Sequence, residues 1–185
     1  VLGPFTLSRE MAYYGGHSGS YSDVRPDYLV KEAAQLAYNA GIDMSVYDNN
    51  NDGYVDNLSV VTAGYNEAEG GPDNSIWPHD SMINPVLVGS VKVCAYLIIS
   101  EYKGKTGTTQ AGIGTYCHEF GHALGLPDFY NTESSETYTI GSWAIMCSGS
   151  YNNNGCTPPT YTAFERFAMG WLVPEQLQES RSYQL

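Results

Sequence analysis

The sequence is poor in basic residues. Only 8 Lys and Arg residues stand against 20 Asp and Glu residues, so the 185-residue chain has a formal net charge of −12. The basic residues are scattered and form no patch, so we expect neither a nucleic-acid partner nor attraction to an anionic membrane surface. The low lysine content, together with 16 tyrosines, is typical of proteins that are secreted or displayed at the cell surface.

Long apolar runs are also missing. The longest, VKVCAYLII at 91–99, contains Lys92 and is too short to cross a bilayer, so we expect no membrane insertion. The first residues, VLGPFTLSRE, have neither the basic start nor the apolar stretch of a signal peptide. We therefore expect that a signal and any pro-segment lie outside this sequence, which would then be a fragment of a longer secreted precursor.

Cysteine is scarce too, and the sequence leaves the disulfides open. Cys147 and Cys156 bracket the loop SGSYNNNG and could close it, whereas Cys94 and Cys117 fall in apolar elements where buried free thiols are common. Because 42% of the residues are hydrophobic, the chain can bury a core without a disulfide framework.

Neither an internal repeat nor a linker divides the sequence, which predicts a single domain over residues 1–185. Apolar periodicity and turn residues predict helices over 26–41, 109–125 and 160–170, a strand over 58–63, and a hairpin over 86–99 that turns at Gly89-Ser90. Long loops, chiefly 64–85 and 131–159, separate these elements. Helices at both ends with strands between them favour a mixed α/β (α+β) fold.

The most informative stretch is YCHEFGHALGLPDFY at 116–130. Residues i and i+4 lie on one face of a helix, so the imidazoles of His118 and His122 can bind one zinc ion. Glu119 lies beside the first histidine and can take a proton from a metal-bound water molecule without binding the metal itself. A core helix with hydrogen-bonded histidines is the alternative, but burying these groups without a metal would be costly.

The residues after His122 predict a third metal ligand. Gly125 can adopt the left-handed conformation that ends a helix, and Pro127 disfavours helix at the residue before it. The resulting turn can bring Asp128 back toward the two histidines. Three protein ligands with one open position are typical of a catalytic zinc site.

A second candidate metal site lies in DNNNDGYVD at 48–56. Its spacing matches the first nine positions of a helix–loop–helix calcium loop, with glycine at position 6 for the sharp turn. Position 12 is Ser59 instead of a bidentate glutamate, and LSVV reads as a strand, so the exiting helix is missing. We expect a structural calcium loop of this type that is followed by a strand and takes a further ligand from elsewhere or from water. A solvated turn is the alternative. The expected ligands are Asp48, Asn50, Asp52, Tyr54 (through its carbonyl) and Asp56.

Several segments together resemble a known family. HEFGHALGLPD is similar to the extended zinc motif of metzincin-type metallopeptidases, and WAIMCSGSY at 143–151 resembles their tight turn, with Met146 as the methionine beneath the metal. More closely, the chain resembles the immune inhibitor A family of secreted bacterial metallopeptidases. The matching segments are YDNNNDGYVDNLSVVTAGY (47–65), SIWPHD (75–80), GIGTYCHEFGHALGLPDFY (112–130), GSWAIMCSGSYNNN (141–154) and the run FERFAMGWLVP (164–174).

The resemblance implies a metzincin-like zincin domain with a twisted mixed sheet, an active-site helix and a Met-turn. It also implies zinc bound by His118, His122 and Asp128, with Glu119 as the general base. In another class of such enzymes a glutamate on a later helix is the third ligand, and Glu165 has a suitable position. We favour Asp128, because a capping box with Thr162 already explains Glu165.

The expected activity is that of a zinc endopeptidase that acts on proteins or peptides, with the enzyme as a monomer. Tyr151 is the first candidate to assist zinc at the developing oxyanion, and His79 is the second. A surface tyrosine remains the simpler interpretation of Tyr151. An inactive, calcium-stabilised binding module of the same fold and a zinc amidase that acts on a non-protein amide are the alternative functions.

Overall fold

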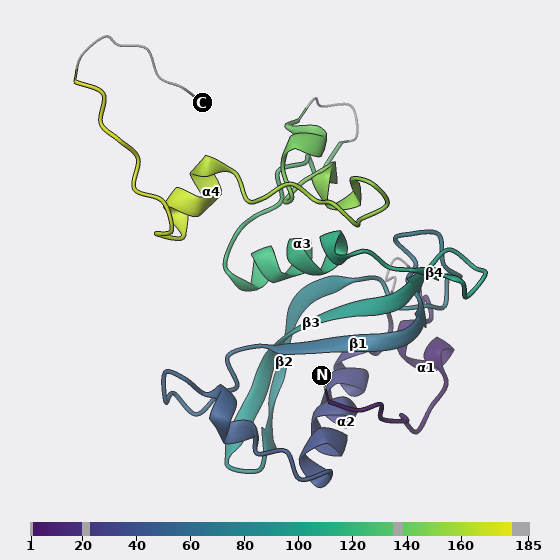
Figure 1. Cartoon of the computed structure of the whole chain (residues 1–185). Helices are drawn as coiled ribbons and strands as arrows, with labels where there is room; N and C mark the ends of the chain where they lie inside the picture. Colours follow the sequence, from purple (N-terminus) through teal and green to yellow (C-terminus); the bar gives the residue numbers. More distant parts are fainter. Residues whose placement is uncertain (1, 20–22, 135–138, 179–185) are drawn as a thin grey trace.

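A computed structural model describes residues 2–19, 23–134 and 139–178, and it contains a mixed four-stranded sheet with helices on both faces (Figure 1). The strands are β1 (Leu58–Tyr65), β2 (His79–Val88), β3 (Val91–Lys103) and β4 (Thr109–Gln110). The α-helices are α1 (Met11–Gly15), α2 (Pro26–Asn39), α3 (Ile113–Ala123) and α4 (Ala163–Ala168). Short 3-10 helices are η1 (Met44–Tyr47), η2 (Gly141–Trp143) and η3 (Ser148–Tyr151).

The sheet has the order β1-β3-β2, with β3 parallel to β1 and antiparallel to β2, and the short β4 also pairs with β3. The β2–β3 hairpin turns at Gly89, whose φ of +66° is a conformation that glycine adopts at no steric cost. The mixed α+β fold predicted from the sequence is confirmed, and it is consistent with a zincin-like peptidase domain.

The main core lies between one face of the sheet and α2. Pro26 begins this helix, and its apolar stripe is buried against the strands. The buried residues of this stripe are Leu29, Val30, Ala34 and Ala37. From the strands, Val93 and Ile98 of β3 are fully buried in the same cluster. Burial of this stripe anchors the sheet that carries α3 on its opposite face.

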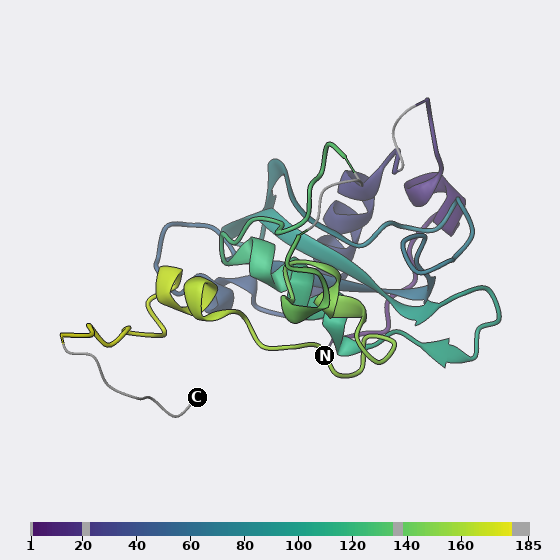
Figure 2. The same ribbon diagram turned by 90° about the horizontal axis from the view of Figure 1, so that it is seen from above.

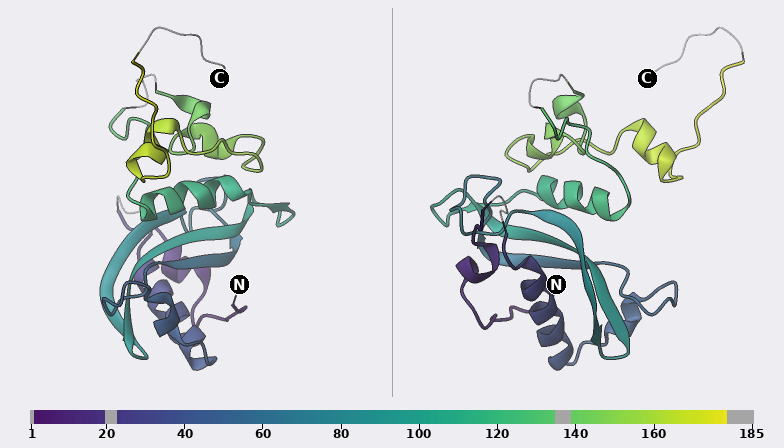
Figure 3. Two further views of the ribbon diagram at one scale, coloured as in Figure 1. Left: turned by 60° about the vertical axis from the view of Figure 1, so that its left-hand side comes forward. Right: turned by 180° about the vertical axis from the view of Figure 1, so that it is seen from behind.

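Helix α3 crosses the other face of the sheet, and the segment that follows it folds over α3 (Figures 1 and 3). Helix η3 contacts α3, and the segment that carries it overlaps α3 when the molecule is seen from above (Figure 2). A small second cluster of buried residues joins α3 to this segment, with Leu126, Ile145 and Met146 at its centre. The helix is therefore enclosed between the sheet and residues 139–170.

The bounds of several elements differ from those predicted. The expected helix over 109–125 begins only at Ile113, because residues 109–110 pair with β3 as β4. Strand β2 begins at His79, inside the stretch expected to be a loop over 64–85. The third expected helix, over 160–170, is shorter at 163–168, and α1 was not predicted. The helix over 26–41 and the strand over 58–63 are confirmed with small changes at their ends.

All four cysteines are free thiols in the structure, so the disulfide considered between Cys147 and Cys156 is not formed. Cys147 is buried and Cys156 is exposed. Within the described ranges, no helix is both long and apolar enough to cross a membrane.

Candidate metal centre

The two histidines of α3 lie one turn apart and face the same side of the helix, as their spacing predicted. Their ring centroids are 4.8 Å apart, and the rings are nearly perpendicular. Each ring is held by a backbone carbonyl: Nδ1 of His118 lies 2.8 Å from the oxygen of Ile145, and Nδ1 of His122 lies 2.8 Å from the oxygen of Leu126. Both Nε2 atoms are thereby directed into the space beside the helix.

The sharp end of α3 brings Asp128 to this space. Gly125 has a φ of +89°, and its N–H donates to the His122 oxygen while the N–H of Leu126 reaches back to Gly121. Farther along, the N–H of Phe129 donates to the oxygen of Met146. These bonds fold the chain back on the helix, so that Oδ1 of Asp128 lies 3.2 Å from Nε2 of each histidine.

The hydrogen bonding of this group fits a metal ion. A carbonyl oxygen only accepts, so each Nδ1 must carry the proton, and a neutral histidine then presents an unprotonated Nε2. Oδ1 of Asp128 is buried, and no hydrogen-bond donor in the described ranges reaches it. Three potential ligand atoms therefore converge within 4.8 Å of one another, an arrangement that suits a cation between them. It is the one such cluster of three or more His, Cys, Asp or Glu residues in the described part of the chain.

Met146 lies beneath the metal centre, as expected of a Met-turn. Its side chain is fully buried and packs against Gly121, where an added Cβ would lie 2.3 Å from the methionine sulfur. The neighbouring residue Ile145 supplies the carbonyl that holds His118. This turn therefore both supports the helix from below and fixes the orientation of the first histidine.

Glu119 lies beside the ligand group and is only 8% exposed. Burial raises the pKa of its carboxyl group to about 7, while the electrostatic interaction with His122 and the backbone N–H of Asp80 oppose the shift. Asp80 belongs to β2, so the start of this strand lies against the face of α3 that carries Glu119. A carboxylate with a pKa near neutrality is suited to exchange protons with a reacting group.

Comparison with known proteins agrees with this geometry. Residues 1–172 match the model of the immune inhibitor A peptidase M6 catalytic domain. The chain belongs to this peptidase family. It is also 34% identical to the pre-pro-metalloprotease PrtV of Vibrio cholerae serotype O1 over 93% of its own length, and 27% identical to immune inhibitor A of Bacillus thuringiensis subsp. alesti over 85%.

These relatives are much longer than the chain. The alignments cover 21% of PrtV and 27% of immune inhibitor A. The match to the family model confirms the family that the sequence predicted, which is a family of metallopeptidases.

Two tyrosines, Tyr130 and Tyr151, lie near the candidate metal centre. Tyr130 stacks on His118 with ring centroids 6.3 Å apart, and burial with the nearby charge of Asp128 raises its pKa. Tyr151, the residue expected at the oxyanion, is 49% exposed at the end of η3. Burial raises the pKa of Tyr151, and the negative charges of Glu69 and Glu119 raise it further. The phenol of Tyr151 is therefore close enough to both carboxylates to interact with them. Tyr130 was not singled out from the sequence, although it lies two residues after Asp128.

His79 and Glu165 do not join the metal centre. The ring of His79 contacts Tyr96, which belongs to the core between the sheet and α2, on the face away from α3. Both ring nitrogens of His79 are engaged, Nδ1 with the oxygen of Trp77 at 2.6 Å and Nε2 with the hydroxyl of Tyr96 at 2.9 Å. Glu165 is fully buried in the capping box of α4 with Thr162, as predicted.

The candidate calcium loop over 48–56 forms a compact turn that leads into β1. The carboxylate of Asp48 accepts hydrogen bonds from the N–H groups of Asp52 and Gly53, each 3.0 Å long. Asn50 and Asp56 accept from other members of the same loop. Gly53 has a φ of +85°, which agrees with the sharp turn expected at position 6, and a strand follows the loop in place of a helix.

Proposed function

We propose that this chain is the catalytic domain of a zinc-dependent endopeptidase. The observation that supports the proposal most strongly is the convergence of three acceptor atoms from His118, His122 and Asp128, with the buried carboxyl group of Glu119 beside them. Two nitrogen ligands and one carboxylate oxygen, with room for a further ligand, are typical of catalytic zinc sites. Membership of a metallopeptidase family supports the same reaction class.

The three ligands would hold zinc, which when bound supplies a Lewis acid and lowers the pKa of a water molecule to about 7. In the proposed reaction, Glu119 accepts a proton from the attacking water and later delivers it to the leaving amine. The phenol of Tyr151 donates a hydrogen bond to the oxyanion that develops on the attacked carbonyl. The carbonyls of Ile145 and Leu126 keep both histidines oriented throughout.

The substrate would be a protein or peptide in an extended conformation. Strand β2 pairs only with β3 among the strands described, so its other edge is open to a further strand. Its start lies at the metal centre, because the backbone N–H of Asp80 reaches Glu119. Backbone hydrogen bonds from a peptide that adds to this edge would place a peptide bond next to the base.

We also propose how the domain is organised, where it acts and which second metal it binds. The chain is a single catalytic domain that acts as a monomer outside the cell, with neither a nucleic-acid partner nor insertion into a membrane. The loop over 48–56 binds a structural calcium ion, which offsets the repulsion between its three carboxylates. The proposal of calcium rests on the loop spacing; within the described ranges, the carboxylates of Asp48, Asp52 and Asp56 do not converge as a group of metal ligands.

Zinc-loaded protein is expected to cleave casein or gelatin, and EDTA or phenanthroline should abolish the cleavage. The Glu119→Ala variant should bind zinc as the wild type does and lose turnover by about 100-fold or more, because general-base catalysis contributes this much. A variant that keeps full activity would exclude Glu119 as the base. Absence of cleavage by correctly folded, zinc-loaded protein would exclude the proposed activity.

A further inference from the structure

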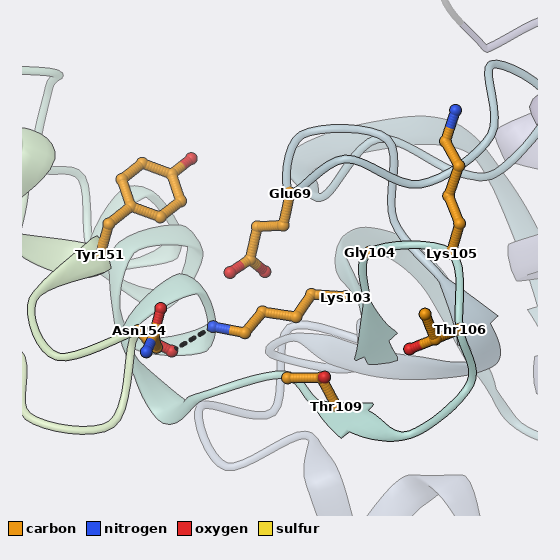
Figure 4. A pocket seen from close by; sticks show the side chains of 8 residues that line it. All are labelled: Glu69, Lys103, Gly104, Lys105, Thr106, Thr109, Tyr151 and Asn154. Carbon is orange, nitrogen blue, oxygen red and sulfur yellow. Dashed lines mark hydrogen bonds between the residues drawn. The ribbon is translucent and has the colours of Figure 1, made fainter.

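A cavity of about 460 Å³ lies at the amino-terminal end of α3 (Figure 4). The turn before β2 forms one wall, the β3–β4 connection forms a second wall, and the η3 loop forms a third. The lining residues are Glu69, Lys103, Gly104, Lys105, Thr106, Thr109, Tyr151 and Asn154. Neither the expected metal ligands nor the expected calcium loop contributes to this cavity.

The cavity borders the proposed reaction centre. Thr115 lies one turn before Glu119 on the same face of α3, and its hydroxyl donates to Oε2 of Glu69 over 3.4 Å. Thr115, beside the cavity, and Glu119, beside the metal centre, are thus separated by about one helical turn, or about 5.4 Å. Two residues of an extended peptide span about 7 Å, which is enough to cover this separation. Tyr151, which lines the cavity, lies near both Glu69 and Glu119. A side chain in the cavity would therefore belong to a residue within about two positions of the attacked bond.

Two glycines keep this wall close to the helix. A Cβ at Gly114 would lie 1.8 Å from the carbonyl oxygen of Ser150, and one at Gly112 would lie 2.2 Å from the backbone of Gly155. The N–H of Gly114 also donates to the oxygen of Gly155 over 2.8 Å. Close packing of backbone on backbone holds the η3 loop, and with it Asn154, in a defined place beside the cavity.

Two of the charged side chains that line the cavity are an acceptor, Glu69, and a donor, Lys103. Oε2 of Glu69 is held by the amide of Asn66 at 2.9 Å and by Thr115, and Figure 4 shows the carboxylate directed into the cavity. Nζ of Lys103 donates to the carbonyl oxygen of Asn154 over 2.7 Å and keeps further donor capacity. Lys105 points away from both groups (Figure 4). The two charged ends thus face the same space from different walls.

We propose that this cavity is a specificity pocket that takes a carboxamide side chain, glutamine or asparagine, with Glu69 and Lys103 as the residues that select it. The proposal rests on the proposed peptidase function. The amide NH₂ group donates to Glu69, and the amide oxygen accepts from Lys103. A lysine side chain would meet the ammonium group of Lys103, and a glutamate would meet the carboxylate of Glu69. An apolar side chain would leave the remaining hydrogen-bonding capacity of both charged groups unused and shield it from water.

Sequencing of the products from a peptide library tests the selection. Zinc-loaded wild-type protein should cut with Gln or Asn enriched about tenfold at one position within two residues of the cut, since a hydrogen bond to a charged group has about this effect. Glu69→Ala and Lys103→Met should each remove most of the enrichment while cleavage continues at other sequences. Glu10→Ala, which removes an exposed glutamate next to α1, is the matched control and should keep the wild-type pattern.

A binding measurement provides a second readout that does not need turnover. In the Glu119→Ala background, a labelled peptide with Gln at the selected position should bind about tenfold more tightly than its Leu counterpart. Glu69→Ala should equalise the two affinities. If library peptides are cut without any such enrichment, or if both variants keep it, the pocket proposal is wrong although the peptidase function stands. If no library peptide is cut, the proposed peptidase activity is excluded. The affinities for a Gln peptide and its Leu counterpart then test the pocket on their own: a tighter Gln peptide supports the pocket, and equal affinities exclude it.

Discussion

Gly121 and Met146 are in direct contact beneath the metal centre, and the contact leaves no room for a side chain at position 121. An added Cβ would lie 2.3 Å from Sδ and 3.0 Å from Cε of the methionine. Glycine inside a helix costs about 0.5–1 kcal/mol relative to alanine, so its presence here reflects packing rather than helix propensity. The contact sets the distance between α3 and the Met-turn. It thereby also sets the position of His122, which follows Gly121 in the helix.

Gly121→Ala is therefore expected to lower the free energy of unfolding by about 1–3 kcal/mol, as overpacking typically does, and to weaken metal binding. The measurement is denaturant unfolding with and without zinc. Combining it with Met146→Ala tests the cause, because the double variant should be less destabilised than the sum of the two single variants. Strictly additive effects would show that the two residues do not interact.

Calcium should stabilise the protein through the loop over 48–56. Binding to the native state alone contributes about 2.7 kcal/mol at a ligand concentration 100 times the dissociation constant, which corresponds to several degrees in Tm for a domain of this size. Tm should therefore rise with added calcium and fall after EGTA treatment. Asp56→Asn, which keeps an acceptor oxygen but removes a charge, should flatten the calcium dependence. If the Tm of the wild-type protein is the same with and without calcium, the loop over 48–56 does not bind a structural calcium ion.

The local patterns of the sequence predicted which residues of the candidate metal centre come together. The spacing of His118 and His122 reflects helix geometry, the end of the helix depends on Gly125, and the capping box of α4 needs only Thr162 and Glu165. Each of these features involves residues a few positions apart, whose relation is set by the backbone conformation of a single element. The structure accordingly places them as expected.

Features that depend on distant segments were missed. Glu69 reaches Thr115 across 46 positions, and no local pattern marks that contact. Strand β2 was read as a loop in its first half because that half is polar and is followed by Pro85. The register shifts between Met82 and Val86, and an edge strand tolerates proline at such an irregularity. Tertiary pairing with β3 therefore outweighed the local sequence.

Stability is expected to fall as pH rises from about 4 to 6, because of Asp23. Burial raises the pKa of its carboxyl group from 3.8 to about 6, and the N–H of Trp77 opposes the shift. The charge of Glu67 raises this pKa further, and that of His17 lowers it. Since the native state then binds the proton more tightly than the unfolded state, the contribution is complete below pH 4 and is lost as pH passes through 6.

Asp23→Asn keeps an acceptor for Trp77 and removes the charge. It should raise the free energy of unfolding at pH 7 by on the order of 1–3 kcal/mol relative to the wild type, and the gain should vanish near pH 4. Urea unfolding curves of both proteins across this range provide the check. A difference between the two that does not vary with pH would show that Asp23 titrates normally.

The free thiols lead to a chemical prediction. Denatured, unreduced protein should react with iodoacetamide at all four cysteines, and intact mass should show four additions per chain. In the native protein, exposed Cys156 should react first and buried Cys147 last. A protein that takes up only two groups before reduction would contain a disulfide.

Metal analysis of the purified protein tests whether His118, His122 and Asp128 form one zinc site. Inductively coupled plasma mass spectrometry should find one zinc per wild-type chain after dialysis against a zinc buffer. It should find much less than one in Asp128→Ala, because a buried acceptor that faces both histidines is then missing. Zinc content that stays at one per chain in Asp128→Ala, or is near zero in correctly folded wild-type protein, would show that these three residues do not form a zinc site.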